Sequence, residues 1–491
     1  MRTALVLLLL LALASVGGSL LPQVPNSPER VARYLVDHPA WGEVFWRTGM
    51  FDVFGSWWFA LITVLLFVSL VACLVPRSRA LLRAMRQAPV QARELDGLRH
   101  VASFTAATDG ATAVETARSV LRRRRFRVAV ADDGRGLGAD KGIAREAGSL
   151  LFHWAFVLLL LGVIVGKGFG FTGRATLAEG QTWADAAANY DPRSYRPGRF
   201  FTDGHSGAGI RLLSFEDGFR DSGVPMDFVS TVELLDPEGA VVRTEEVRVN
   251  HPVEFEGLRI FQYGFGWAPV ITVRDGSGRV ISEAPVIFGQ GVAPEGVSQL
   301  AMPWSGFVKL PGLEPQVAVE LELWPDSEAY LRSLETGEPQ PMVIERAPFM
   351  RYTVWQGPLT DPSLARLDTR FMTRVDQGVV GAARTVDLPG ATMTFSELRQ
   401  YSVLQVSKDD GVGVVLGAAI LVLVGLFPGL YVSRRKVWVR VSDDAAGARV
   451  QIGGFALQRK AQFEDEFTSI VDAVAASAGA ARDQREMVRT R

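Results

Sequence analysis

The apolar residues of this chain are concentrated in four stretches that contain no Asp, Glu, Lys or Arg beyond Arg2. They cover residues 1–21, 57–75, 149–166 and 411–432. A helix that crosses a bilayer needs about 20 apolar residues, whereas a soluble helix of this length carries polar residues at helical spacing. The pattern therefore predicts four transmembrane helices.

The first stretch has a competing interpretation. Its Met1-Arg2 start, its apolar run and the small residues at 14–18 are also typical of a secretory signal peptide. Both interpretations place the next segment, residues 22–56, outside the cytoplasm, where we expect a short helical segment.

Charge is sorted among the segments between the predicted spans. Residues 76–148 hold 15 Lys and Arg against 8 Asp and Glu, residues 433–491 hold 11 against 8, and residues 167–410 hold 22 against 33. Basic flanks of membrane spans stay in the cytoplasm. We therefore expect a multi-pass protein of the plasma membrane, with both termini cytoplasmic and residues 167–410 extracytoplasmic.

The two basic segments differ in their local patterns. Residues 77–86 form a basic amphipathic stretch that suits the inner membrane surface, and residues 132–138 suit a hairpin turn better than a phosphate-binding loop. The remainder of 76–148 predicts a small α/β loop, with strands at 101–108 and 126–131 and a helix at 112–125. The C-terminal tail, 433–491, predicts one amphipathic helix at 465–478 and a disordered end from residue 480.

The large segment 167–410 is dominated by strand signals. Short runs with apolar or β-branched alternation are separated by turns such as Asp236-Pro-Glu-Gly239. This pattern predicts an all-β, sandwich-like antiparallel domain. The expected strands are 210–215, 228–235, 241–249, 260–263, 270–274, 316–323, 352–355, 382–388 and 391–395.

Composition removes several classes of function. The 491 residues carry a net charge of −1, so no basic surplus supports nucleic-acid binding. The single cysteine, Cys73, excludes an internal disulfide, a dithiol motif and a cysteine-based metal cage, and it reads as a small apolar residue of the second span. The chain has only five histidines as strong metal ligands.

His153 is the one histidine inside a predicted span, about one helical turn from its cytoplasmic end. An ionisable residue at this depth is a functional candidate, and imidazole is a common axial ligand of haem iron. The alternative is an interfacial histidine bonded to a neighbouring helix. Because no other span contains a histidine, a site with two histidines needs a second subunit or a second copy of the chain.

The other candidates have weaker patterns. His38, His205 and His251 form no ligand motif, and each is expected to be a surface or turn residue, with His251 the most notable of them. Trp57 and Trp58 begin the second span and suit an interfacial aromatic belt, with haem or lipid contact as the alternative. Two small-xxx-small pairs, 162–166 and 413–417, suit close helix packing.

Several stretches together resemble the ResB (also called CcsB) family of cytochrome c biogenesis proteins. Gly148-Ser-Leu-Leu-Phe-His-Trp154 is similar to the membrane histidine motif of that family. The resemblance extends in order over nearly the whole chain through residues 17–23, 49–59 with Cys73, 249–253, 257–262, and 425 with 434–440.

The resemblance implies a membrane subunit of the System II cytochrome c maturation complex, with a retained first span. Such a subunit helps to carry haem b across the membrane for attachment to apocytochrome c. The implied partners are a ResC/CcsA-type membrane protein with a WWD motif, apocytochrome c, a thioredoxin-like thiol reductant and membrane lipid. His153 matches the haem-ligating membrane histidine, while Trp57, Trp58 and His251 are weaker candidates for cofactor contact.

Two rival functions belong to other classes. A membrane-anchored β-domain would act as a scaffold or binding protein of the cell envelope without any cofactor. A b-type redox subunit would need two ligands within its own spans, and the sequence offers one. The resemblance implies that the chain is one half of a haem-lyase complex and that its own role is either non-catalytic or co-catalytic.

Overall fold

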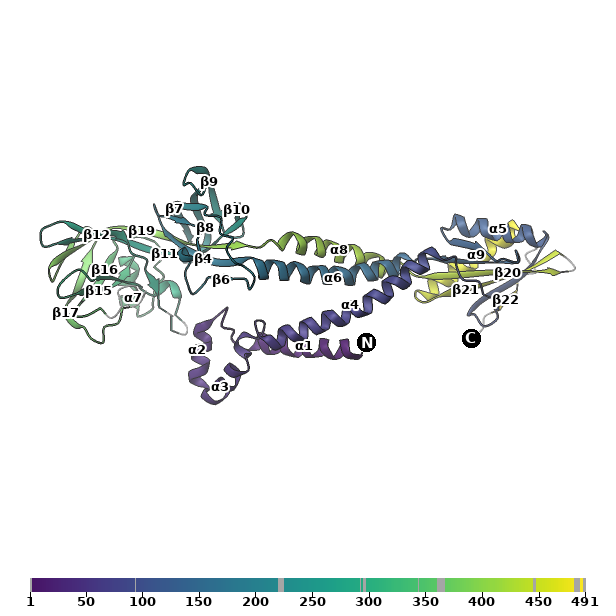
Figure 1. The fold of residues 1–491 in the computed structure, drawn as a ribbon, viewed down its shortest axis with the longest axis horizontal. Coiled ribbons are helices and arrows are strands. Elements are labelled where there is room, and N and C mark those ends of the chain that lie inside the picture. The colour runs from purple at the N-terminus through teal and green to yellow at the C-terminus, as the bar shows by residue number, and fades with distance from the viewer. Residues whose placement is uncertain are drawn as a thin grey trace. The chain divides into compact units, whose positions relative to one another are not determined.

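The computed structural model describes residues 2–92, 94–219, 225–291, 293–294, 297–342, 344–359, 367–444, 447–480 and 486–488. The chain forms two compact units (Figure 1). The first comprises Met1–Val163 and Val412–Arg491, and the second comprises Ile164–Gly411.

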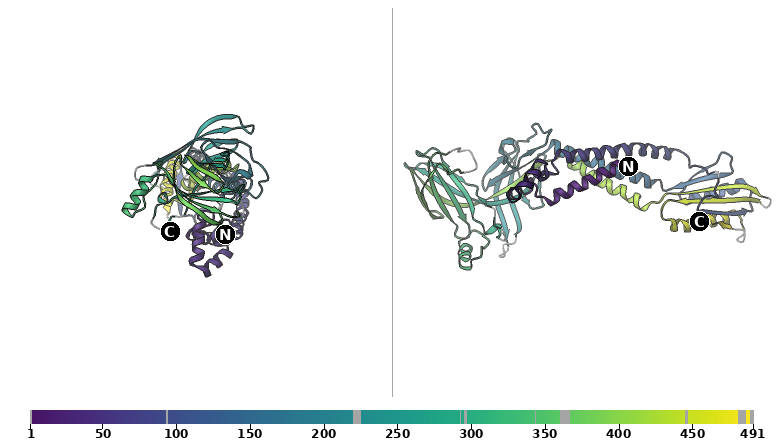
Figure 2. Two further views of the ribbon diagram at one scale, coloured as in Figure 1. Left: turned by 90° about the vertical axis from the view of Figure 1, so that its left-hand side faces the viewer. Right: turned by 90° about the horizontal axis from the view of Figure 1, so that it is seen from below.

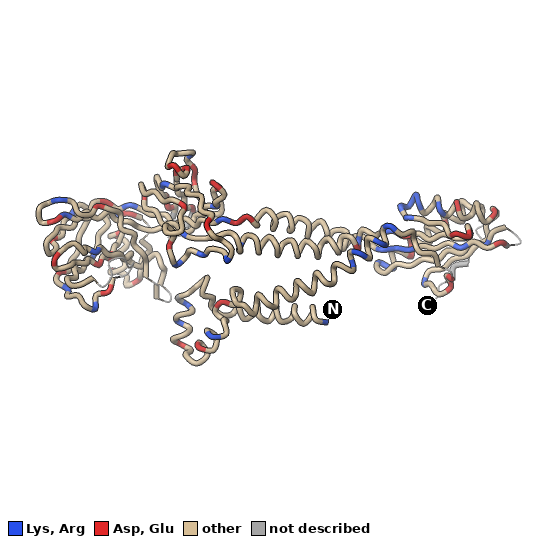
Figure 3. Tube along the Cα trace, in the orientation of Figure 1, with Lys and Arg blue, Asp and Glu red and all other residues tan. Residues whose placement is uncertain are grey.

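Four helices are long and apolar enough to cross a membrane, as the sequence predicts. They are α1 (Arg2–Leu20), α4 (Trp57–Arg86), α6 (Ala144–Phe169) and α8 (Val412–Tyr431). Figure 3 shows α1, α8 and most of α6 almost free of charged residues, whereas Lys and Arg gather at the C-terminal end of α4. Residues 77–86 continue α4 through Pro76, so this basic stretch is the end of a long helix and not a separate one.

The helices α1 and α4 lie side by side, and the segment between them is helical as expected (Figures 1 and 2). It contains α2 (Pro28–Asp37), α3 (Pro39–Arg47) and the 3-10 turn η1 (Met50–Asp52). The buried side chain of Gln23 holds this segment together, because its Nε2 donates to the Met50 carbonyl at 3.1 Å and its Oε1 accepts from the Val53 N–H at 3.0 Å.

The predicted cytoplasmic loop and tail form one domain. Their strands make a single antiparallel sheet in the order β2-β3-β20-β21-β1-β22. Helices α5 and α9 pack on it around one apolar core that draws on both segments. The elements are β1 (His100–Ala106), α5 (Gly110–Arg123), β2 (Arg127–Val130), β3 (Gly136–Lys141), β20 (Arg435–Asp444), β21 (Gly447–Ala456), α9 (Lys460–Ser477) and β22 (Glu486–Val488).

This domain confirms the expected strands, helix and hairpin turn of the loop and corrects the expectation for the tail. The tail contributes the helix α9 and also β20 and β21, whose alternating apolar residues fill the centre of the sheet. Residues 486–488 pair with β1, so this part of the predicted disordered end is a strand. Residues 481–485 and 489–491 lie outside the described residues.

The second unit is built from three antiparallel sheets and one α-helix within the described residues. Its elements are β4 (Phe171–Ala178), β5 (Thr182–Ala184), η2 (Ala187–Asn189), β6 (Arg196–Pro197), β7 (Gly209–Phe219), β8 (Pro225–Leu235), β9 (Val241–Arg248), β10 (Val253–Phe255), β11 (Leu258–Asp275), β12 (Val280–Pro285), β13 (Gly289–Gln290), η3 (Gln299–Ala301), β14 (Trp304–Leu310), β15 (Val317–Trp324), α7 (Ser327–Thr336), β16 (Phe349–Gln356), β17 (Thr373–Gly381), β18 (Thr385–Leu388) and β19 (Ala391–Lys408).

Two strands of 18 residues, β11 and β19, pair along their whole length and belong to two cores. One half of the ladder packs with the sheet β5-β7-β8-β9, and the other half packs with the sheet β13-β14-β15-β16-β17. The structure therefore confirms the antiparallel sandwich architecture that the sequence predicts. There are two sandwiches, and they share the strand pair β11 and β19.

Strand pairs flank the helices α6 and α8 at both ends. Before α6 and after α8, β3 pairs with β20, with Lys141 opposite Arg435. After α6 and before α8, β4 pairs with β19, with Phe171 opposite Lys408. Both strand pairs are antiparallel, so the chain enters α6 and leaves α8 through adjacent strands, and it leaves α6 and enters α8 through adjacent strands.

A glycine contact joins α6 and α8 near the β3 and β20 end. A Cβ atom on Gly425 would lie 2.5 Å from the backbone nitrogen of Phe152 and 2.8 Å from the carbonyl oxygen of Gly148. The expected pair at 413–417 makes no such approach, because a Cβ atom on Gly413 or Gly417 would meet no described atom within 4 Å. The close contact of α8 therefore uses Gly425.

We expect Gly425→Ala to lower the stability of the purified protein by about 1–3 kcal/mol, because the added methyl group overlaps backbone atoms that cannot move alone. Thermal unfolding in detergent, followed by tryptophan fluorescence, measures the effect. Gly417→Ala on the same helix is the matched control and should leave the midpoint unchanged or slightly higher. Equal midpoints for the two variants would contradict the packing described above.

Candidate functional site

His153 lies in the third turn of α6, after Gly148 and Ser149. Its ring is half-buried, and its Nδ1 lies 2.6 Å from the carbonyl oxygen of Ser149, one turn earlier in the same helix. A carbonyl oxygen only accepts hydrogen bonds, so this contact places the imidazole proton on Nδ1. The lone pair then resides on Nε2, the nitrogen that a metal would bind.

Within the described residues, Nε2 of His153 has no hydrogen-bonding partner. The sequence left open a bond to a neighbouring helix, and the observed bond stays within α6. The ring packs against Phe152, with ring centroids 5.2 Å apart. The histidine is thus oriented by its own helix and keeps one nitrogen available.

The neighbours of His153 show which sides of α6 are covered. The backbone of Phe152 faces Gly425 of α8, and the indole Nε1 of Trp154 donates to the Ser78 hydroxyl of α4 at 3.0 Å. Successive helical residues are rotated by about 100°. His153 is therefore rotated about 100° around the helix axis from both of these residues, and its side chain is half-buried there.

The tryptophan candidates lie far from His153 along α4. Trp57 begins the helix and is 76% exposed, while the indole of Trp58 donates to the Thr48 carbonyl at 2.9 Å. Ser78, which contacts Trp154, lies 21 residues beyond Trp57, or about 31 Å along a helix. The structure does not bring the tryptophans and His153 together.

His251 belongs to the second unit, in the turn between β9 and β10. It is exposed, and its Nδ1 lies 3.1 Å from the carbonyl of Val249 in the same turn. The structure gives it the local role of a turn residue.

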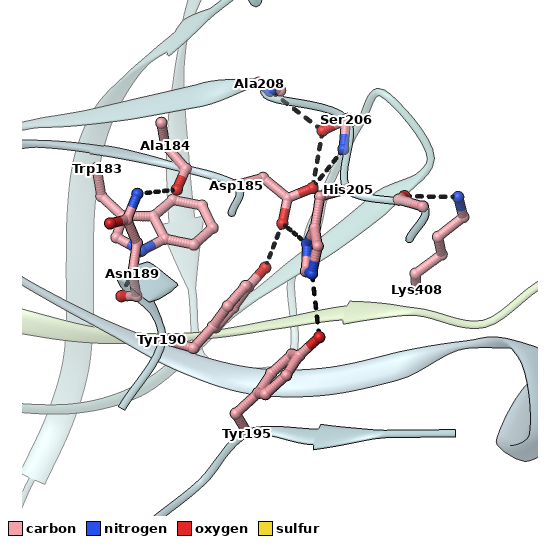
Figure 4. A network of polar contacts seen from close by, with 11 residues as sticks. Trp183, Ala184, Asp185, Asn189, Tyr190, Tyr195, His205, Ser206, Ala208 and Lys408 are labelled. Carbon is pink, nitrogen blue, oxygen red and sulfur yellow. Dashed lines mark hydrogen bonds and ion pairs between the residues drawn. The ribbon is translucent and has the colours of Figure 1, made fainter. Parts of the chain in front are cut away.

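A buried polar cluster in the second unit was missed by the sequence analysis (Figure 4). The Asp185 side chain is fully buried and accepts from the Tyr190 hydroxyl at 2.7 Å, His205 Nδ1 at 2.7 Å, the Ser206 N–H at 2.6 Å and the Ser206 hydroxyl at 3.0 Å. The other ring nitrogen of His205 bonds the Tyr195 hydroxyl at 3.0 Å. We call these five residues the Asp185 cluster.

The Asp185 cluster lies close in the fold to the strand that follows α6. The His205 ring packs 4.7 Å from the ring of Phe171, the first residue of β4, and Lys408 at the end of β19 donates to the Gly204 carbonyl at 3.0 Å. The cluster therefore ties the loop after β6 to the strands that continue α6 and lead into α8. Burial and the nearby Asp185 carboxylate raise the pKa of the Tyr190 hydroxyl.

The expectation that His205 is a surface residue is wrong, since its side chain is only 9% exposed. Its partners come from a loop and short strands between residues 182 and 206, where no periodic pattern marks which side chain is buried. The aromatic content of residues 183–205 is the one sequence signal that could have suggested a packed cluster.

The described residues contain no group of three or more His, Cys, Asp or Glu side chains placed to hold a metal ion. A haem iron needs only one or two protein ligands, because the porphyrin supplies the others. A single oriented imidazole such as His153 fits that requirement, and its surroundings are apolar, since its ring packs on Phe152, which in turn packs on Phe156.

Four apolar helices and a folded β-rich unit between the third and fourth define a multi-pass class of membrane protein. Residues 1–468 match the family model described as ResB-like family, which confirms the resemblance seen in the sequence. The chain belongs to the ResB-like family.

Similar proteins named cytochrome c biogenesis protein CcsB cover nearly the whole chain. The protein of a Picosynechococcus species is 24% identical over 97% of this chain and 90% of its own length. That of Trichormus variabilis is 25% identical over 99% and 93%, and that of a Synechococcus species is 27% identical over 96% and 95%.

We expect Asp185→Ala to destabilise the protein by about 3 kcal/mol or more, because it leaves several buried donors without an acceptor at about 1–3 kcal/mol each. Thermal unfolding of the purified protein measures the loss. Asp203→Ala removes an exposed carboxylate nearby and should change the midpoint little. A similar small effect for both variants would show that the cluster does not stabilise the fold.

Stability should also fall at alkaline pH. Burial raises the pKa of Tyr401 to about 12 from an ordinary value of 10.0, and the pKa of Tyr190 is raised as well. Unfolded tyrosines ionise near pH 10 while these two resist, so their contribution is complete below pH 10 and is lost as pH rises toward 12. Between pH 8 and 11, the thermal midpoint of the Tyr190→Phe/Tyr401→Phe variant should fall less steeply with pH than that of the wild type. An equal slope for the two proteins would contradict this assignment.

Proposed function

We propose that this chain is a subunit of the System II cytochrome c maturation complex, which carries haem across the membrane and presents it to apocytochrome c. The observation that carries the proposal is the orientation of His153 in a predicted membrane span, where Nδ1 is bonded to Ser149 and Nε2 has no partner among the described residues. The names of the relatives, cytochrome c biogenesis protein CcsB, support a role in cytochrome c biogenesis.

Haem b is the cargo of this proposed function, and His153 provides one axial ligand to its iron. The Ser149 carbonyl fixes the tautomer in which Nε2 can bind iron, so the ligand is ready without rearrangement. A second membrane protein would bind at the face of α6 that carries His153. A WWD-motif partner of the ResC/CcsA type would supply the second ligand across this face.

The chemistry of attachment belongs to other components. Cys73 is the only cysteine and lies in the apolar part of α4, so thiols must come from apocytochrome c, kept reduced by a thioredoxin-like protein. The β-rich unit then shields haem or orients apocytochrome c. We therefore assign this chain a co-catalytic or purely presenting role in the complex.

The proposed topology follows from charge. Basic residues flank the spans on the side of the domain formed by β1–β3 with β20–β22, so this domain is cytoplasmic. The β-rich unit is then extracytoplasmic. His153, near the start of α6, then lies toward the cytoplasmic leaflet, where haem would enter.

The decisive experiment replaces His153 by alanine in the complex purified with its partner. The absorption spectrum of the wild-type complex should show a haem Soret band, and His153→Ala should lose most of it and most of the cytochrome c yield. Added imidazole should restore part of the band by occupying the vacated ligand position. His251→Ala, at an exposed turn histidine, is the matched control and should keep the wild-type spectrum.

Two results would overturn the proposal in different ways. Unchanged haem content and cytochrome c yield in His153→Ala would exclude this ligand. A wild-type complex that never contains haem would instead favour the scaffold function, in which the β-rich unit binds an envelope protein without a cofactor.

The topology predicts opposite labelling of two exposed turns. In a Cys73→Ser background, Glu238→Cys lies in the turn between β8 and β9, and Asp132→Cys lies in the turn between β2 and β3. A membrane-impermeant maleimide should label the first variant in intact spheroplasts and the second only after permeabilisation. Labelling of both, or the reverse order, would reject the proposed orientation.

A further inference from the structure

An open cavity of about 700 Å³ lies at the C-terminal end of α1, between that helix and α2. The residues at 18–23, the following turn and Phe54 line one side of it, and α2 lines the other. Neither His153 nor the Asp185 cluster contributes to its lining. The cavity is therefore separate from the sites described above.

One face of α2 gives the cavity a positive lining. Arg30, Arg33 and Asp37 are three and four residues apart, so they share a face of the helix, and His38 follows at its end. Within the described part of the chain, neither Arg30 nor Arg33 forms an ion pair or a side-chain hydrogen bond. Arg47 of the adjacent α3, by contrast, pairs with Glu43 at 2.6 Å.

The cavity lies at the level where a membrane would end. The 19 residues of α1 span about 28 Å, close to the hydrocarbon thickness of about 30 Å. The start of α4 lies beside the end of α1, since a Cβ atom on Gly18 would meet the Phe54 ring at 3.0 Å. Two large aromatic side chains near this level are exposed, as in an interfacial belt: Phe54 in the cavity lining and Trp57 at the start of α4.

From these observations we propose that the cavity binds the phosphate-bearing headgroup of an anionic phospholipid. Two unpaired guanidinium groups present planar donor forks that match phosphate oxygens. Leu20, Leu21 and Phe54 line the same cavity and provide apolar contact for the glycerol and upper acyl region. One carboxylate, Asp37, opposes the two arginines, which leaves the lining positive and favours a headgroup with a single net negative charge.

This site gives α2 and α3 a physical function that does not depend on haem. A bound anionic lipid neutralises Arg30 and Arg33 and holds the helical segment against the membrane surface beside the aromatic belt. It fixes the position of the ends of α1 and α4 relative to the bilayer.

The test measures lipid binding to the purified full-length chain by native mass spectrometry, with phosphatidylglycerol and phosphatidylcholine as probes. The wild type should retain phosphatidylglycerol preferentially. Arg30→Gln/Arg33→Gln should weaken that binding roughly 25-fold, or about fivefold for each arginine near an anionic lipid. Arg47→Gln removes an arginine of the same helical segment outside the cavity and should bind as the wild type does.

Two further measurements, a lysine variant and a competition with soluble phosphates, test the proposal even if the glutamine variant folds poorly. Arg30→Lys/Arg33→Lys retains the charge and should retain most of the phosphatidylglycerol, whereas glycerol phosphate at millimolar concentration should not displace the lipid. Equal retention of the two lipids by the wild type, or equal phosphatidylglycerol binding by the wild type and the glutamine variant, would overturn the site. Full displacement by glycerol phosphate or inorganic phosphate would show that the cavity binds a soluble anion and not a lipid.

Discussion

Antiparallel strand pairing at both ends of α6 and α8 is the constraint on which the rest of the structure depends. The chain enters α6 from β3 and returns from α8 into β20, and these strands are neighbours in one sheet. At the other ends, β4 and β19 are neighbours in another sheet. Each ladder is stabilised by its own apolar core, so the helices need little contact with each other, and the Gly148–Gly425 approach provides it. A helix that makes few contacts within its own chain keeps faces available for another subunit.

The same constraint explains where buried charge and polar groups accumulate. At the β3 and β20 end, Arg434 pairs with Asp140 at 3.4 Å and with Glu146 at 3.0 Å, so a basic residue that flanks α8 also joins it to the start of α6. At the β4 and β19 end, the Asp185 cluster and Lys408 tie a loop to the corresponding strands. Buried polar groups stabilise a fold when they are paired, and the four hydrogen bonds that Asp185 accepts meet this condition.

The sequence predicted the elements well and their assembly poorly. The four uncharged stretches could be predicted as spans because length and composition alone indicate one, although the first also fits a signal peptide. Local pattern does not indicate that residues 76–148 and 433–491 share one sheet, since they are separated by the whole second unit. The sequence predicts separate strands at 260–263 and 270–274, because the intervening glycines and Pro269 resemble a break. In the structure both belong to one strand, β11. Gly266 is required there by packing, since a Cβ atom would lie 2.4 Å from the Tyr401 hydroxyl. His153 could be identified by its membrane depth, whereas His205 could not, since its partners meet only in the folded loop.

The chain has few of the side chains that a two-histidine haem site or thiol chemistry would need. It has one cysteine and one histidine within its predicted spans, and the hydrogen bond that orients this histidine stays within its own helix. The Nδ1 bond to Ser149 orients the imidazole, whereas Nε2 adds no hydrogen bond to the fold within the described residues. The proposed role of His153 as a haem ligand would account for this combination of an oriented ring and an unbonded nitrogen, which packing among the described residues does not use.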